Sequence, residues 1–534
     1  MRGFAGKRGF AGKLVVAAVA VAALTGLPNG ARADSVLRIK MVGDLKQIDP
    51  IWTTAFPVRD MAYLVWDTLF AMDKDFKVQP QMVGKYDVSG DGTVYTMTLR
   101  DGLKWHDGAD VTSADCIASL QRWMTKDSLG GELKKHLDKF EEVDAKTFKL
   151  VLKEPWGLTL AALGKPSSYV PFMMPKRLAE TPSDKEISTP IGSGPYIMKM
   201  DEWVPGGKAV YVKNPNYVPR SEPASFMAGG KIAKVDRIER IHIPDDVSAV
   251  NALINGEIDY MEGVPPDMLP LIERSNTAEM SIRDPLGKSV QIVLNHLYPP
   301  FNNVKIRQAV QYALSQKNIQ EAYFGNRTQL YKLCPAIFFC GTPFETDVNS
   351  ERYMKQDTEK AKALLKEAGY DGTPVVLLHN SDQKEFDDYL TVVVQDLRKA
   401  GFTVEDTRLE VASIFQRRAS KAAPAQGGWN LFATAWGGID QMSPITNVYV
   451  SGACDKAWFG WPCDEELQKL RASFFEAKTD DDRKAIAVKI QARTNDVVTF
   501  VPMGQNFLIT ARSKKLDGLL PGPVSSFWNV SKLN

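Results

Sequence analysis

Residues 431–440 read Leu-Phe-Ala-Thr-Ala-Trp-Gly-Gly-Ile-Asp: a short apolar run, a tryptophan, two glycines and an acid. An apolar run of this length before glycines predicts a buried strand. Gly437 and Gly438 allow a sharp turn and the close approach of a ligand. With the flat face of Trp436 and the charge of Asp440, the stretch has what a binding pocket at a strand end needs. An ordinary strand, a glycine turn and a solvated acid fit the same residues.

The N-terminus has the pattern of a secretory signal peptide. Basic residues precede the apolar run Leu14–Leu27, and the A-x-A motif Ala31-Arg32-Ala33 follows it. The apolar run is too short to span a membrane, and no cysteine at the cut offers a site for a lipid anchor. We therefore expect cleavage after Ala33 and a soluble, exported chain located in the periplasm.

The charge of the exported chain is nearly balanced. The whole sequence has 66 basic and 64 acidic side chains, and residues 1–33 hold five of the basic ones and no acid, which leaves a net charge of −3. A slightly acidic protein is not expected to have nucleic acid as its main partner. Roughly 500 residues predict two or three domains with substantial cores.

Four of the five cysteines form two close pairs along the chain. Cys334/Cys340 and Cys454/Cys463 each enclose a short loop, and export permits disulfides. Short loops predict about 2 kcal/mol or less of stabilisation from each bond. A four-cysteine zinc site is the alternative, although the spacings lack the C-x-x-C form. The fifth, Cys116, is predicted to be a buried thiol on a helix.

The N-terminal half contains helix and hairpin signals. Apolar spacing predicts a helix over Met61–Phe70, and Gly90-Asp91-Gly92 between alternating runs predicts a β-hairpin. Thr112 or Ser113 is expected to cap a helix that continues to Trp123.

In the C-terminal half, strands and helices alternate. Helices are expected at 357–368, 385–400 and 412–420, and strands at 375–379, 403–409 and 431–436. This alternation predicts an α/β domain with a mixed or mostly parallel sheet.

The chain lacks common catalytic motifs. G-x-S-x-G, H-E-x-x-H and P-loop sequences are absent, and the five histidines are scattered. Trp105–Asp110 offers His106 and two acids for a metal, but an Asp-Gly turn explains the same residues. A carboxylate pair for glycoside cleavage need not be close in sequence, so a secreted hydrolase remains an alternative. We predict no catalytic residue, metal or cofactor.

Several short motifs follow one another along the chain: Leu99–Gly108, Val111–Asp115, Ile191–Tyr196, Lys213–Tyr217, Asn251–Asp259, Asn302–Leu314 and Asp357–Tyr370. Together, and in this order, they resemble the family 5 extracellular solute-binding proteins. These are the peptide, dipeptide and nickel binding proteins of bacterial ABC importers. Singly these motifs are weak, but in this order they are specific.

The resemblance implies an α/β, two-lobed periplasmic-binding-protein fold (type II, cluster C-like) with an extra inserted domain. Two lobes would close over a ligand by hinge motion. The implied division is lobe one at 34–70, 190–284 and 503–534, the inserted domain at 71–189, and lobe two at 285–502.

The resemblance also implies site residues. In peptide-binding members a strand ends in Trp-x-x-Asp, and the acid pairs with the ligand amine. Here Asp440 lies one residue further from Trp436 than in that pattern, and Ser443 replaces a second acid. Some members place an arginine near the start of the helix at 385–400, where this chain has Lys384 and several acids, so a ligand other than a plain dipeptide is expected.

Aromatic side chains are further candidates for the site. The family's first Asp-Pro loop lines the cleft, which makes Trp52 and Thr53 candidates; core packing is the alternative for Trp52. Trp458, Phe459 and Trp461 would form an aromatic wall or a surface loop tucked onto lobe two.

The implied function is capture of a peptide or peptide-like small solute for import. The partners would be that ligand and the permease and ATPase subunits of an ABC importer, and the protein would be a monomer without enzymatic activity. An opine, a sugar derivative or a metal chelate is the alternative ligand.

Overall fold

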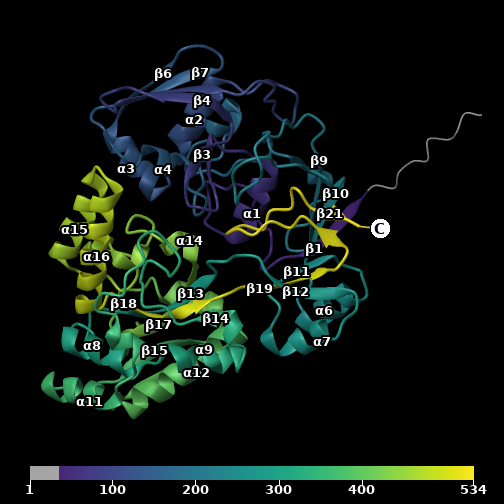
Figure 1. Cartoon of the computed structure of the whole chain (residues 1–534). Helices are drawn as coiled ribbons and strands as arrows, with labels where there is room; N and C mark the ends of the chain where they lie inside the picture. The colour runs from purple at the N-terminus through teal and green to yellow at the C-terminus, as the bar shows by residue number, and fades with distance from the viewer. Residues whose placement is uncertain (1–34, 534) are drawn as a thin grey trace, which may run out of the picture. The chain divides into compact units, whose positions relative to one another are not determined.

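The computed structural model of the chain describes residues 35–533 (Figure 1). The predicted signal peptide and its cleavage site after Ala33 lie outside the described residues. Within the described part, no helix has both the length and the apolar character needed to cross a membrane.

A seven-stranded sheet collects strands from distant parts of the chain. Its order is β12-β19-β11-β1-β10-β9-β8, and β1 runs parallel to both of its neighbours while the other pairs are antiparallel. With helices α1, α6 and α7 it forms what we call the seven-stranded module. The elements are β1 Val36–Lys40, α1 Phe56–Val65, β8 Tyr196–Met198, β9 Lys208–Lys213, β10 Arg237–Ile241, α6 Asp246–Ile254, β11 Tyr260–Glu262, α7 Leu269–Glu273, β12 Ala278–Ile282 and β19 Ile509–Ser513.

A four-stranded antiparallel sheet, β4-β5-β7-β6, is the centre of a four-stranded module. The predicted hairpin at Gly90–Gly92 joins β4 to β5, and Thr112 caps α2 through a capping box with Asp115, as expected. The elements are β4 Val83–Val88, β5 Val94–Leu99, α2 Ser113–Trp123, α3 Ser128–His136, β6 Leu137–Glu142, β7 Thr147–Leu152, α4 Thr159–Leu163 and α5 Lys176–Ala179. Small two-stranded pairs are β2 Phe70–Met72 with β3 Val78–Pro80 and β20 Leu516–Asp517 with β21 Ser531–Lys532.

A six-stranded sheet, β14-β18-β13-β17-β15-β16, defines the six-stranded module. The predicted alternation of strands and helices is confirmed here within a few residues. Of the two predicted kinds of sheet, mixed or mostly parallel, the structure has the mixed one, in which only β17, β15 and β16 run parallel. The strands are β13 Lys288–Leu294, β14 Tyr331–Lys332, β15 Val375–Asn380, β16 Val404–Leu409, β17 Leu431–Gly437 and β18 Phe500–Asn506. The helices are α8 Val304–Ala313, α9 Gln316–Phe324, α10 Glu351–Met354, α11 Thr358–Glu367, α12 Lys384–Lys399, α13 Val411–Arg417, α14 Gly438–Gln441, α15 Glu465–Glu476 and α16 Asp480–Val497.

The helix predicted at Met61–Phe70 is wrong by half its length, because the structure begins α1 at Phe56 and ends it at Val65. Proline at the start of α1 fits the first helical turn, where its missing N–H costs no hydrogen bond. Trp66 is already extended, with φ −113° and ψ 163°. The apolar residues that follow are buried in and beside β2, so their spacing reflects burial on several sides and not one helix face.

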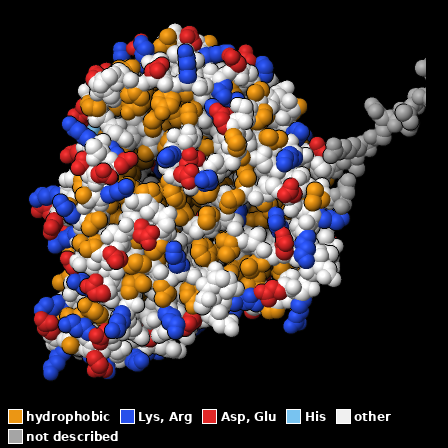
Figure 2. Space-filling view, viewed as in Figure 1, with side chains coloured by type: hydrophobic (Ala, Val, Ile, Leu, Met, Phe, Trp, Pro, Cys, Tyr) orange, Lys and Arg blue, Asp and Glu red, His pale blue; other side chains and the backbone are white. Residues whose placement is uncertain are grey.

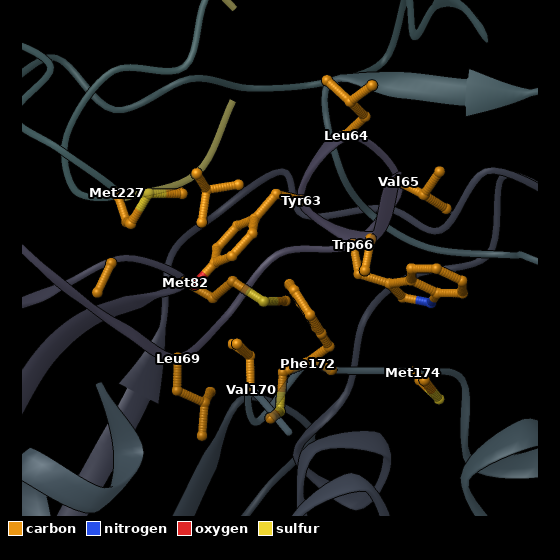
Figure 3. Packing of buried hydrophobic residues seen from close by; sticks show 14 of the residues in the cluster. Tyr63, Leu64, Val65, Trp66, Leu69, Met82, Val170, Phe172, Met174 and Met227 are labelled. Carbon is orange, nitrogen blue, oxygen red and sulfur yellow. The ribbon is translucent and has the colours of Figure 1, made fainter. Parts of the chain in front are cut away.

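The hydrophobic cores join the modules. One core contains buried side chains of both the seven-stranded and the four-stranded module, including those in Figure 3. Ile445 and Phe475 of the six-stranded module pack against the same core. Figure 2 shows hydrophobic side chains gathered in the middle of one face, with charged side chains around them.

Candidate functional site

The glycine pair at the end of β17 serves packing and not an unusual backbone angle. Gly437 is extended, with φ −64° and ψ 149°, and Gly438 starts the short helix α14. A Cβ atom on Gly438 would lie 2.8 Å from Leu286 and from Phe339. A Cβ atom on Gly437 would lie 3.3 Å from Oδ2 of Asp440. The absence of a side chain at Gly438 therefore lets α14 pack closely on Leu286 and Phe339, and its absence at Gly437 leaves room for the Asp440 carboxylate.

Asp440 is buried, with 3% of its surface exposed, so the solvated acid considered from sequence is wrong. Its Oδ2 atom accepts no hydrogen bond from any described residue, and no lysine or arginine nitrogen in residues 35–533 lies within 4.0 Å of the carboxylate. Burial raises the pKa of Asp440, and the nearby Arg59, Ser167 and Lys165 oppose this effect. These neighbours come from α1 and from the segment after α4, so distant parts of the chain meet at Asp440.

Arg59 of α1 lies near Asp440, but its hydrogen bonds go to Ser167 and Asp60. Its Nη1 donates to Oγ of Ser167 at 2.8 Å, and its Nη2 donates to Oδ1 of Asp60 at 2.9 Å. One turn later, Tyr63 packs edge-on against Phe172 at 4.9 Å between ring centroids, and Figure 3 shows both side chains gathered near Met82. This core holds α1, and with it Arg59, in place.

Acids outnumber cations around Arg59. Burial raises the pKa of Asp60 and of Asp284, and in both cases Arg59 opposes the shift. The buried Glu262 acts on Asp60, and its partner Arg283 has an Nε atom that is buried without an acceptor. Four buried carboxylates, Asp440 included, therefore share two arginines, because Lys165, the other cation near Asp440, is paired with Asp127. This balance favours a cationic group from a bound molecule.

Trp436 is half-buried in an aromatic cluster. Its ring meets Tyr449 at 6.3 Å and Trp458 at 6.4 Å, both edge-on. Trp461 is buried against Trp429, while Phe459 stacks on Arg418. The loop that carries these residues is thus tucked onto the six-stranded module. Trp458 nevertheless contacts the ring of Trp436, the candidate wall of the ligand site.

Trp52 and Thr53 lie in a separate environment. The Nζ atom of Lys126 sits 4.9 Å from the centre of the Trp52 ring, and Oγ1 of Thr53 accepts a hydrogen bond from Ala55. Asp49, just before them, is fully buried and pairs with Arg122 at 2.7 Å. The structure thus ties this loop to α2 and to Lys126 just after that helix. Sequence reasoning missed Arg59, Lys165 and Ser167, which carry no motif of their own.

Both predicted disulfides are present. Cys334 bonds to Cys340, and Cys454 bonds to Cys463. Phe339, inside the first loop, is one of the two residues that pack on Gly438. Cys116 is a buried free thiol on α2, as predicted. The described residues contain no cluster of three side chains suited to a metal ion, and Trp105–Gly108 forms the expected turn, closed by a 2.9 Å backbone hydrogen bond.

Solved structures with the same architecture define the class. The periplasmic binding protein AgaA of A. tumefaciens R10, in complex with agropinic acid, matches with a TM-score of 0.76 and 23% identity over 93% of this chain and 99% of that one. The periplasmic binding protein DppA of Helicobacter pylori, in complex with the peptide STSA, matches with a TM-score of 0.77 and 20% identity over 93% and 98%. The chain has the two-lobed fold of a periplasmic binding protein, which confirms the expected fold class.

Sequence comparison gives the family. Residues 77–458 match the middle region of the bacterial extracellular solute-binding proteins of family 5. The probable peptide ABC transporter periplasmic-binding protein y4tO of Sinorhizobium fredii is 36% identical over 525 residues, which cover 98% of both chains. The chain belongs to family 5, as its motifs predicted, and it is the solute-binding component of an ABC importer. Such a component works with a small solute and with permease and ATPase subunits.

Proposed function

We propose that this protein captures a peptide or a peptide-like small solute in the periplasm and delivers it to the permease. The observation that carries this proposal is the buried Asp440 carboxylate, whose Oδ2 atom accepts no hydrogen bond within residues 35–533. A buried carboxylate needs a cationic partner or several donors. An amine on the solute supplies both, and the name of the 36% identical relative supports a peptide.

The proposed roles follow the neighbours of each residue. Asp440 receives the solute amine, Trp436 offers its ring as a wall, and Gly437 leaves space for the carboxylate. Gly438 supports the turn by its contact with Phe339. Trp52 and Thr53 remain a prediction from the family's Asp-Pro loop, on the far side of the solute.

Hinge closure is the proposed mechanism. Lobe one would consist of residues 34–70, 190–284 and 503–534, with residues 71–189 inserted in it as an extra domain. Lobe two would consist of residues 285–502. A solute that touches both lobes stabilises the closed form by its difference in affinity for the two forms. No bond of the solute breaks. We also propose a monomer that is released from its signal peptide after Ala33.

A non-peptide solute is the second candidate. At the start of α12, Lys384 pairs with Asp388 at 2.7 Å and Glu385 pairs with Lys288 at 2.5 Å. None of the first residues of α12 is an arginine of the kind that holds a peptide carboxylate in some relatives, and Arg408 of β16, which reaches this end of the helix, is paired with Asp387 at 2.6 Å. This difference, with the one-residue shift of Asp440, favours an opine, a sugar derivative or a metal chelate as the alternative.

Native mass spectrometry of the purified protein tests the proposal. We expect a stoichiometric complex with a co-purified solute that is recovered unchanged, and a higher Tm with peptides than with sugars or opines. If only another solute class raises the Tm, the peptide assignment fails. Recovery of a cleaved solute would favour the hydrolase instead.

Replacement of Asp440 by Asn tests its role. The variant keeps the shape of the side chain but loses its charge, so affinity for an amine-bearing solute should fall by about thirtyfold or more. Isothermal titration calorimetry measures this loss, and unchanged affinity removes Asp440 from the site.

A further inference from the structure

A cavity of about 510 Å³ lies between the four-stranded and six-stranded modules. One wall is α3, with Leu129, Glu132 and His136; the other is formed by Ile445, Phe475 and Arg471. The volume is in the range of small-molecule sites. Because its walls belong to different modules, the cavity exists only where the modules meet.

Arg471 is the unusual residue of this cavity. Its Nη2 atom makes one long hydrogen bond, 3.4 Å, to the carbonyl oxygen of Pro444, and its buried Nε atom has no acceptor. Within residues 35–533 no carboxylate oxygen lies within 4.0 Å of this guanidinium. Burial lowers the pKa of Arg471, and Glu132 opposes this effect. A cation in such a place lacks the partner that burial normally requires.

Both walls of the cavity are linked to the surroundings of Asp440. On one side, Asp127 caps α3 by accepting a hydrogen bond from Gly130 at 2.7 Å and also pairs with Lys165, one of the charges beside Asp440. On the other side, only four residues separate Asp440 from Ile445, which lines the cavity. Arg471 itself donates to the carbonyl oxygen of Pro444, in the short segment that joins the two places.

The net charge of the cavity wall favours a ligand group with a single negative charge. Its wall has three cations, Lys135, Lys456 and Arg471, against the carboxylates of Glu132 and Glu476. One excess positive charge matches a single carboxylate better than a doubly charged phosphate. The fork of arginine donors also fits the geometry of a carboxylate.

We propose that Arg471 binds a carboxylate of the imported solute and so determines specificity. The inference rests on the proposed function and deepens it. The solute class is amphoteric: its cationic group lies at Asp440, its carboxylate lies at Arg471, and its apolar part packs on Leu129, Ile445 and Phe475.

The test uses a panel of di- to tetrapeptides, each as the free acid and as the C-terminal amide, with Arg471→Met, Arg471→Lys and a control. The control is Lys469→Met, which removes a positive charge from the exposed face of the same helix, where Lys469 pairs with Glu465 at 2.7 Å. We expect the wild type and the control to prefer the best-binding acid over its amide by about thirtyfold or more. Arg471→Met should remove this preference, and Arg471→Lys should keep part of it.

Three outcomes overturn the inference in distinguishable ways. If the wild type binds amides as tightly as acids, Arg471 has no such role, although peptide binding stands. The same holds if Arg471→Met keeps the preference. If no acid or amide raises the Tm of the wild type, the peptide function fails and the inference fails with it. Should Arg471→Met not fold, Arg471→Lys and the acid-to-amide comparison on the wild type still decide.

Discussion

At the scale of single residues, Asp440 combines burial with a negative charge that the protein itself does not pair. Burial raises its pKa above the ordinary value of 3.8. The folded, ligand-free protein therefore holds a proton at Asp440 more tightly than the unfolded chain does. It follows that the free energy of unfolding falls as the pH rises from about 4 through the raised pKa.

Asp440→Asn should consequently stabilise the ligand-free protein at pH 7, because the amide carries no buried charge. We expect a gain on the order of 1 kcal/mol, seen as a higher Tm, which shrinks as the pH approaches 4. Differential scanning calorimetry from pH 4 to pH 8 measures it, with the fully exposed Asp481→Asn as control. A lower Tm at pH 7 would contradict a destabilising charge at Asp440.

Substitution of the two glycines before Asp440 should have different effects: Gly438 should affect stability and Gly437 should affect solute binding. Gly438→Ala forces a methyl group against Leu286 and Phe339, so it should lower the free energy of unfolding by about 1–3 kcal/mol. Gly437→Ala presses on the Asp440 carboxylate at 3.3 Å, so it should weaken solute binding with a smaller change in stability. Tm and Kd of both variants test the difference; equal effects on both quantities would count against it.

At the scale of elements, prediction succeeded where one periodicity dominated. The helices at Thr358–Glu367 and Lys384–Lys399 have one apolar face and clear ends, and the structure places them within a few residues of their predicted bounds. It failed at α1, because Trp66, Leu69 and Phe70 are buried outside the helix. Where a segment is buried on every side, apolar spacing no longer reports a helix.

The disulfide-closed loop Cys334–Cys340 is an element that supports the site, since Phe339 within it packs on Gly438. Replacing both cysteines by serine should cost about 2 kcal/mol or less of stability, as expected for a short loop. It should also weaken solute binding, because α14 loses its support. Thermal unfolding and calorimetric titration measure the two effects. Cys116→Ala, which leaves both disulfides intact, is the control, and an unchanged Kd for the double variant argues against a supporting role.

At the scale of the whole molecule, the site depends on contacts between modules. Arg59 and Lys165 lie hundreds of residues before Asp440 and in other modules, yet both act on its carboxylate. If a bound solute holds the modules together, both sides of the cleft become more stable against local opening at the same time.

Hydrogen exchange should show this coupling. With a saturating solute, amide exchange should slow in both α1 and α14, whereas α11, remote from the site, should not change. Asp440→Asn protein under the same conditions should show little slowing in either segment. Protection of α14 alone would indicate binding to one lobe without closure.

The sequence by itself determined the family, both disulfides and the local elements of the six-stranded module, and it singled out Trp436 and Asp440 as candidate site residues. These depend on motifs, spacing and periodicity, which are local properties of the chain. Only the tertiary structure decided that Asp440 is buried, that Gly438 packs on Phe339, and that Trp52 lies beside Lys126. The partners of Asp440 were likewise beyond sequence, because burial and charge pairing arise from residues that meet only when distant segments fold together.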